Sequence, residues 1–273
     1  MSEKTLRLKG IASRHERVVV IVSPPRCGST PLSRVFWEHP SFRYYCHEPF
    51  ECAYFDEEGF NSACEKLQSP TDLAELKMQE TPHTTSGLVI KEMPYQVGDN
   101  FPHLIAMSSG PIVFLLRNPM LSVHSRYRKK LEAGQKPVFP VAEMGFELVS
   151  NQIAYCRDQG IPFLIVDSED IRNKPNQVLS QVFERLDLSW SSSFTKWKAL
   201  PHIDLDNLDG RHTHLYTRVL QSTGIQPNNA PPRTLEDFPV DNGFRDHVAY
   251  SMNIYETLRA DPARIKMENC SAV

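Results

Sequence analysis

Four short, uninterrupted apolar runs constrain the fold of this chain more than any other feature of its sequence. They lie at residues 17–22, 88–91, 112–116 and 163–166, and helical patterns separate them. Continuous β-branched runs of this length are typical of strands that are buried on both faces of a parallel sheet. Their alternation with helices predicts a three-layer α/β fold, in which helices flank a parallel sheet of four to five strands.

Helical patterns fill the intervals between these runs. Asn118 and Pro119 supply an N-cap and a first helical residue, and that helix is expected to run toward Lys130. Further helices are expected at 60–80, 143–158, 175–186 and 212–222, with a closing helix after Phe244. Residues 1–16 are expected to be a polar lead-in, 41–58 show no clear period, and 189–211 and 225–240 are loop-like. Because no linker divides the chain, residues 1–273 are expected to form a single domain.

Composition narrows the class of protein. The 273 residues are 40% hydrophobic and 23% charged, which excludes disorder, collagen and coiled coil. A net charge of −3 argues against general nucleic-acid binding but is compatible with a local basic pocket. No apolar run approaches the roughly 18 residues of a membrane span, and no signal peptide is visible, so a cytoplasmic protein is expected. None of the six cysteines forms a C-x-x-C pair, so reduced thiols and no metal site are expected.

The segment from Ser23 to Thr30 carries the clearest chemical signal. It follows the first apolar run and opens a helix, where backbone N–H groups lack partners and point toward an anion. Gly28 allows close approach, the hydroxyls of Ser29 and Thr30 add donors, and Arg26 adds a fixed positive charge. A phosphate or sulfate is therefore expected here, although a plain strand-to-helix turn is the alternative interpretation.

The segment does not match the phosphate-binding pattern of ordinary ATPases and GTPases. Ser23 replaces the first glycine of that pattern, and Ser29 stands where its lysine belongs. A second anion-binding corner is expected at Arg117, which ends the third apolar run, and at Ser125, two turns into the next helix. Ser122 and Lys129 can share the face of Ser125.

Taken together, these two corners resemble the sulfotransferases that use 3′-phosphoadenosine-5′-phosphosulfate (PAPS). Residues 25–30, Pro-Arg-Cys-Gly-Ser-Thr, match the 5′-phosphosulfate loop of that family, and Arg117 and Ser125 match the residues that hold the 3′-phosphate. The resemblance spans residues 17–187. It implies PAPS as sulfuryl donor, PAP as product, no metal, and cofactor contacts from Arg26, Cys27, Gly28, Ser29, Thr30, Arg117 and Ser125.

Other parts of the chain fit the resemblance less closely. A late basic loop in the family covers the nucleotide, which implies that Arg211 and His212 do so within a C-terminal region at 189–273. Pro31 stands where many members carry a tryptophan near the adenine, and the segment with the catalytic histidine of cytosolic members is absent. Cys27 lies in an electropositive loop at a helix start, so a low thiol pKa is expected.

A general base must then come from elsewhere. Glu48 resembles a catalytic glutamate of some bacterial sulfotransferases, and an aromatic environment is expected to raise its pKa toward neutrality. His47 and Glu92 are the other candidate bases. The alternative interpretation is structural: Glu48 caps a helix or forms a salt bridge, and Glu92 pairs with Lys91. The catalytic set implied by the resemblance is Glu48, Arg26 and His47.

The acceptor is less well defined. Glu51 and the run Asp56, Glu57 and Glu58 are either a solvated loop or an acidic entrance that attracts a cationic substrate. A small-molecule acceptor is expected, such as a secondary metabolite, with hydroxyl and amine acceptors and the oligomeric state left open. The competing hypotheses are a P-loop-type small-molecule kinase and a protein that binds PAP without catalysing transfer.

Overall fold

The computed structural model describes residues 1–55, 59–76, 83–200, 213–227 and 230–267, with the side chains of 55 and 213–215 left out. Its centre is a six-stranded sheet in the order β3-β2-β4-β1-β5-β6. The strands are β1 (Val18–Val22), β2 (Phe42–His47), β3 (Thr71–Asp72), β4 (Gly87–Glu92), β5 (Ile112–Leu116) and β6 (Phe163–Asp167). All neighbouring pairs are parallel except β2 and β3. The four apolar runs are thus confirmed as strands, each within one residue.

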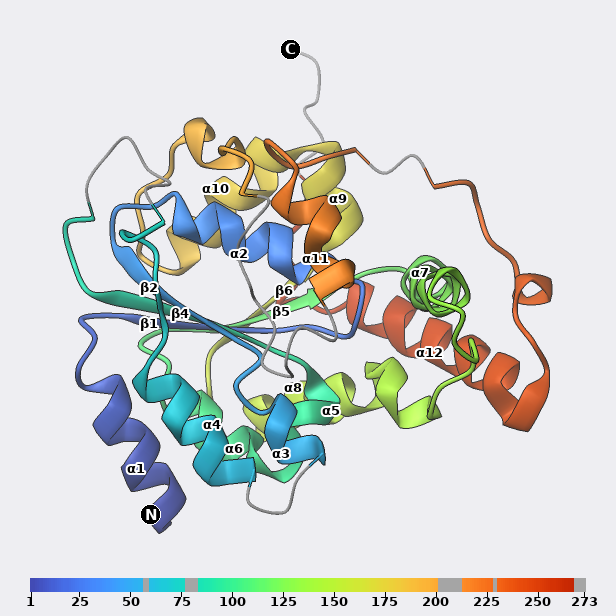
Figure 1. Ribbon diagram of the computed structural model, residues 1–273, viewed down its shortest axis with the longest axis horizontal. Coiled ribbons are helices and arrows are strands. Elements are labelled where there is room, and N and C mark those ends of the chain that lie inside the picture. Colours follow the sequence, from blue (N-terminus) through green and yellow to red (C-terminus); the bar gives the residue numbers. More distant parts are fainter. Residues whose placement is uncertain (56–58, 77–82, 201–212, 228–229, 268–273) are drawn as a thin grey trace.

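Helices cover both faces of the sheet and make the three predicted layers (Figure 1). One face carries α2 (Ser29–Trp37), α9 (Ser168–Asn173), α10 (Pro175–Arg185) and α11 (Thr213–Leu220). The other carries α1 (Glu3–Ala12), α3 (Glu51–Phe55), α4 (Gly59–Gln68), α5 (Pro94–Val97), α6 (Phe101–Ile105), α8 (Phe146–Asp158) and α12 (Phe244–Arg259), and α7 (Pro119–Glu132) packs on α12. Short 3-10 helices are η1 (Gly98–Asn100), η2 (Val141–Met144), η3 (Ser192–Thr195), η4 (Leu235–Asp237) and η5 (Asp241–Gly243).

Strand β1 shows why its sequence is apolar without alternation. Val18, Val20 and Val22 pack in a cluster with α1, α4, α6, α8 and α12, whereas Val19 and Ile21 pack with α2 and α10. Both faces of the strand are therefore removed from water, and a polar residue at any of its five positions would be buried.

Strand β2 was not expected, because residues 41–58 lack a regular apolar period. Its exposure pattern is irregular, with Arg43 exposed, Tyr44 half-buried and a shift of register between Phe42 and Tyr44. The strand lies near the edge of the sheet and pairs on its outer side with the two-residue β3 alone. Tertiary pairing, rather than a local pattern, thus makes this segment a strand.

Two further segments differ from the expectations. The lead-in at 1–16 contains helix α1, whose N-terminus is capped by Ser2 and which buries Leu8 and Ile11 in the core. Because only two residues of this mostly polar helix are buried, its apolar face is too narrow to produce a clear helical period in the sequence. The helix expected at 60–80 ends at Gln68, before β3. Asn118 caps α7 as predicted, because its side chain accepts a hydrogen bond from the Met120 N–H.

Helix α2 is attached to the C-terminal region by a wholly buried cation, Arg34. Its guanidinium lies over the rings of Trp37 and Trp197, at 5.6 and 5.0 Å from their centroids. It donates hydrogen bonds to the carbonyl oxygens of Lys198 at 2.7 Å and Val219 at 3.4 Å. Since Val219 belongs to α11, this contact fixes α11 beside α2.

Substitution of Arg34 by Met is therefore expected to lower the free energy of unfolding by about 2–4 kcal/mol. The variant leaves the carbonyl oxygens of Lys198 and Val219 without their charged donor and removes the buried cation that lies over the rings of Trp37 and Trp197. Urea denaturation would measure the loss. Arg43→Met is the matched control, because Arg43 forms an exposed ion pair with Asp72 and its loss should have a far smaller effect. Equal losses in the two variants would contradict the anchoring role of Arg34.

Candidate active site

The turn from β1 into α2 has the backbone geometry of an anion-binding loop. Gly28 is the residue before the helix and has a φ of 91°, and Arg26 also has a positive φ, of 62°. A β-carbon at position 28 would lie 3.1 Å from Ser168 Oγ and 3.4 Å from an Arg172 nitrogen. Glycine is therefore favoured twice, by its conformation and by the close approach of α9. Ser29 and Thr30 occupy the first turn of α2 and line the same cavity as Arg26.

The two predicted anion-binding corners meet in space. Arg26 Nε donates to Ser125 Oγ at 3.3 Å, and an Arg117 terminal nitrogen donates to the Arg26 carbonyl oxygen at 3.3 Å. Arg117 Nε also donates to Glu169 Oε1 at 3.0 Å, which orients its side chain. The contact arises because β1 and β5 are neighbours in the sheet, so their carboxyl ends open at the same edge.

Cys27 differs from the expectation. Its side chain is wholly buried in the core, with Sγ 3.7 Å from the Pro25 carbonyl oxygen, and it does not reach the cavity. Burial raises the pKa of this thiol to about 12, despite the nearby charge of Arg117. The expected low pKa is therefore wrong, and Cys27 can contact an anion through its backbone alone.

These residues open into a cavity of about 1000 Å³. Among the described residues, ten lysines and arginines line it but only four carboxylates. The basic residues are Arg26, Lys91, Arg117, Arg126, Arg128, Lys129, Lys130, Arg172, Arg218 and Arg233, and the acidic ones are Glu48, Glu51, Glu132 and Glu143. Burial and the charges of Arg117, Arg126 and Arg218 lower the pKa of Arg26, which reflects a strongly positive interior. A ligand with several negative charges fits this cavity.

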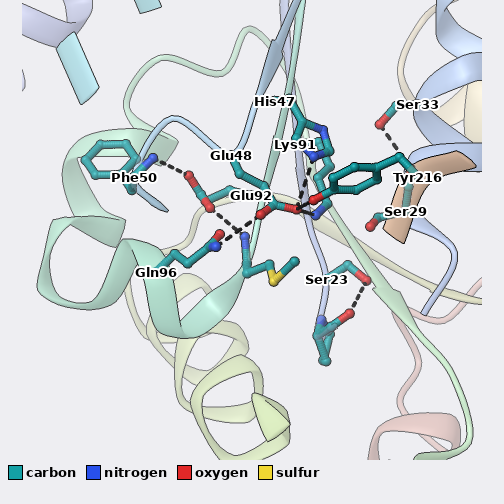
Figure 2. Close-up of polar contacts among 12 residues, drawn as sticks. Ser23, Ser29, Ser33, His47, Glu48, Phe50, Lys91, Glu92, Gln96 and Tyr216 are labelled. Atoms are coloured by element: carbon teal, nitrogen blue, oxygen red, sulfur yellow. Dashed lines mark hydrogen bonds and ion pairs between the residues drawn. The ribbon is translucent and has the colours of Figure 1, made fainter. Parts of the chain in front are cut away.

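Glu48 lies at the wall of this cavity, directly after β2 (Figure 2). Its φ of 44° is unusual for a residue other than glycine, and more so for one that precedes a proline. Its carboxylate is buried and surrounded by partners from three other elements. Oε1 forms an ion pair with Lys91 and lies 3.5 Å from the Tyr216 hydroxyl, and Oε2 accepts from Gln96 Nε2 at 3.0 Å.

The electrostatics of Glu48 reverse the expectation of a raised pKa. Burial alone would raise the pKa, but the charge of Lys91, the adjacent His47 ring and the hydrogen bonds from Lys91 and Gln96 lower it to about 2. Glu48 is therefore ionised throughout the neutral range. The sequence could not indicate this, because Lys91 is 43 residues away along the chain.

His47 faces Glu48 and Tyr45 rather than the cavity. Its Nδ1 lies 2.5 Å from the Tyr45 hydroxyl and its Nε2 lies 3.4 Å from Glu48 Oε1. Burial lowers the pKa of His47 to about 3, against the opposing effect of the Glu48 charge. The ring is therefore neutral and weakly basic, and it packs edge-on against Tyr216 at 4.8 Å.

Glu92 is also wholly buried, and it does not line the cavity. Its Oε2 accepts from the Phe50 N–H at 2.8 Å and its Oε1 from the Met93 N–H at 2.7 Å. Burial, followed by the charge of Glu48, raises its pKa to about 8. The predicted pairing with Lys91 is wrong, because the Lys91 ammonium contacts Glu48 instead.

The remaining predicted residues divide between the cavity and the undescribed parts of the chain. Ser125 and Lys129 line the cavity, whereas Ser122 is buried. Glu51 lines it, but Asp56, Glu57, Glu58, Arg211 and His212 lie outside the described residues. Within the described chain, no three His, Cys, Asp or Glu side chains gather to hold a metal. None of its helices has the length and apolar character required to cross a membrane.

Several residues of the cavity were missed by sequence reasoning. Gln96 and Arg126 carried no signal, because neither belongs to a motif. Tyr216 and Arg218 lie in the stretch predicted as a helix at 212–222, and one helix, α11, places both over the phosphate loop. Arg172 belongs to α9, the helix that directly follows β6. Its Nη1 donates a hydrogen bond to the Gln226 carbonyl oxygen at 2.7 Å.

Comparison with known proteins assigns the family. A family model described as the sulfotransferase domain matches residues 17–268. The chain belongs to this family. The match includes both anion-binding corners, Glu48 and all of α11 and α12, so sulfotransferase membership extends beyond the region in which the sequence resemblance was evident.

Individual relatives are distant. The chain is 28% identical over 172 residues to branched-chain-amino-acid aminotransferase-like protein 1 of Arabidopsis thaliana, and this match covers 60% of the chain but 29% of that protein. The sulfotransferase domain from the curacin biosynthetic pathway is 17% identical, with 87% of this chain and 97% of that chain covered and a TM-score of 0.46. A mouse sulfotransferase in complex with PAP is 14% identical, with 94% and 92% covered and a TM-score of 0.45. The family assignment therefore rests on the family model.

Proposed function

We propose that this protein transfers the sulfuryl group of PAPS to a hydroxyl or amine of a small-molecule acceptor, with Glu48 as general base. The observation that carries the proposal is the convergence of Arg26, Arg117 and Ser125 on one basic cavity whose wall contains Glu48. PAPS carries phosphate groups at two separate positions, and the two contacting corners supply donors for both. The cradle at Gly28, which a β-carbon would fill, suits the close approach of an anion to the backbone.

When bound, PAPS supplies the sulfuryl group and departs as PAP. We infer that Arg26 and the N-terminal N–H groups of α2 neutralise the charge that develops on the departing 5′-phosphate. Arg117 and Ser125 hold the 3′-phosphate, and the contact of Arg117 with the Arg26 carbonyl oxygen couples the two positions. Preorganised charge and positioning supply most of the catalysis in this type of transfer.

Glu48 accepts the proton that the acceptor loses as its oxygen or nitrogen bonds to sulfur. With a pKa lowered to about 2, Glu48 is a weak base toward a free alcohol. Proton transfer becomes favourable only as bond formation makes the acceptor strongly acidic, so it accompanies the transfer rather than preceding it. The ion pair with Lys91 and the hydrogen bond from Gln96 hold the carboxylate in one orientation for that step.

Calorimetric titration with PAP, without magnesium, tests the donor site. Wild-type protein should bind PAP, and Arg117→Ala should weaken binding by about 100-fold, because a charged donor to a phosphate is lost at a mostly buried position. Arg43→Ala, an exposed arginine on β2, is the control and should bind as the wild type does. Failure of the wild type to bind PAP, together with magnesium-dependent binding of ATP, would overturn the proposal.

A further inference from the structure

Glu92 carries a buried carboxyl group that forms no ion pair with a described cation, since Lys91, its neighbour in sequence, pairs with Glu48. A carboxyl group in such a place is costly unless hydrogen bonds compensate for the loss of water. Here both oxygens accept backbone N–H groups, from Phe50 and from Met93 (Figure 2). An apolar side chain of similar size would leave both of these N–H groups without an acceptor, so the carboxyl group of Glu92 serves the two backbone segments that donate to it.

The two backbone groups that Glu92 accepts lie on the two segments that position Glu48. Phe50 is two residues after Glu48, in the turn where Glu48 adopts its unusual positive φ. Met93 is the N-cap of α5, the short helix that carries Gln96 to Glu48 Oε2. One carboxylate thus ties the backbone of the base to the helix that orients its side chain.

We propose that Glu92 is a positioning residue, which braces the turn after β2 against the start of α5 and so holds the Glu48 carboxylate toward the cavity. The positive φ of Glu48 is a strained conformation for a residue other than glycine, and it persists only where its surroundings enforce it. The hydrogen bond from the Glu48 N–H to the Lys91 carbonyl oxygen, at 2.7 Å, fixes one side of the turn, and Glu92 fixes the other. This role rests on the proposed function of Glu48 as the base.

The alternative, that Glu92 itself takes the proton, is not compatible with its contacts. Each of its oxygens points to a backbone N–H, and Glu92 is not among the described residues that line the cavity, so an acceptor bound there does not reach it. Burial and the charge of Glu48 raise the pKa of Glu92, which agrees with a carboxyl group that is enclosed by protein and not exposed to the cavity.

The brace can be tested without any acceptor. In Glu92→Gln the side-chain amide can accept one N–H, but its NH₂ group then meets the other N–H and cannot accept it. Amide hydrogen exchange at Phe50 or Met93 should accelerate by about 10-fold or more, whereas exchange at Phe114 in β5 should remain unchanged and so report an intact fold. Unchanged exchange at both Phe50 and Met93 would overturn the brace.

Kinetics then test whether the brace acts through Glu48. With PAPS and an acceptor found by screening, Glu92→Gln should lower kcat by about 10-fold while the Kd for PAP stays within about 2-fold of the wild type. In a Glu48→Gln background the same change should have almost no further effect on kcat, because the base that it positions is gone. Glu38→Gln is the matched control, since Glu38 also has a pKa raised by burial, to about 7, but lies outside the cavity.

Failure of the positioning role of Glu92 and failure of the proposed sulfotransferase function give different results in these experiments. An equal loss of kcat from Glu92→Gln in both backgrounds would overturn the positioning role while leaving the sulfotransferase activity established. If the wild type bound no PAP and transferred no sulfuryl group, the proposed function would fail, and the exchange experiment would still decide whether Glu92 braces the two segments.

Discussion

Replacement of Glu48 by Gln is expected to lower kcat by about 10²–10⁴-fold, with the Kd for PAP nearly unchanged. Gln96, Lys91 and Tyr216 surround the carboxylate, but none of them can take its place as a proton acceptor at neutral pH. Single-turnover transfer from radiolabelled PAPS would measure the chemical step directly. More than a tenth of the wild-type kcat in Glu48→Gln would place the base elsewhere.

The fold of this variant needs its own control. Loss of the Glu48 charge leaves the Lys91 ammonium buried beside an uncharged amide, and breaking a buried pair in this way typically destabilises a protein by about 3–5 kcal/mol. Undiminished PAP binding would show that the donor site remains assembled. Glu48→Asp keeps the charge but withdraws the carboxylate, so it should fold better than Glu48→Gln and still transfer slowly.

The pKa of Glu48 also determines the pH range in which its ionised carboxylate stabilises the fold. Because its folded-state pKa of about 2 lies below the ordinary value of 4.5, ionised Glu48 stabilises the fold above about pH 4.5, and this contribution is lost as the pH falls toward 2. The same shift means that protonation of Glu48 should not reduce kcat between about pH 7 and 5. A loss of kcat with a midpoint in that interval must come from another group.

Substitution of Arg26 by Gln is expected to lower kcat/KM by about 10²–10³-fold. Arg26 lies in the loop that would face the departing 5′-phosphate, and its carbonyl oxygen accepts the hydrogen bond from Arg117. Gln keeps most of the side-chain length and removes the charge, so the loss reports electrostatic stabilisation of the transition state. Steady-state kinetics over a range of PAPS concentrations would measure it.

Arg26→Lys is the companion variant. Lysine retains a positive point charge that can reach a phosphate, although it lacks the Nε–H that donates to Ser125 Oγ. It should therefore recover most of the activity lost in Arg26→Gln. Equal losses in the Gln and Lys variants would indicate that the shape of the loop, rather than its charge, is what Arg26 contributes. Arg43→Gln, remote from the cavity, should match the wild type.

The two anion-binding corners show how far local sequence information reaches. Arg26 and Ser29 were recognised because a buried strand, a glycine and a helix start occur within a few residues of one another. Arg117 was predicted because it ends a buried apolar run just before the Asn118-Pro119 helix start, and because it matches the family's second anion-binding element. In both cases the predicted anion binding depends on a backbone geometry that residues adjacent in the sequence specify. The parallel pairing of β1 and β5 then brings the carboxyl ends of the two strands together.

Other features depended on contacts between distant segments. Strand β2 has no clear period and exists because β4 pairs with it. Tyr216 and Arg218 reach the cavity because the buried Arg34 fixes α11 beside α2. Neither a periodicity nor a motif in the sequence indicates such contacts.

Glu48 separates the two kinds of information most clearly. The sequence by itself determined that the chain forms an α/β fold, and it predicted two phosphate-binding corners and a candidate base, Glu48, beyond the helix that follows the first of them. Only the tertiary structure decided the charge state of that carboxylate, because Lys91 and Gln96 reach it from β4 and α5. Backbone conformation follows from neighbours along the chain, whereas the pKa of a buried group follows from neighbours in space.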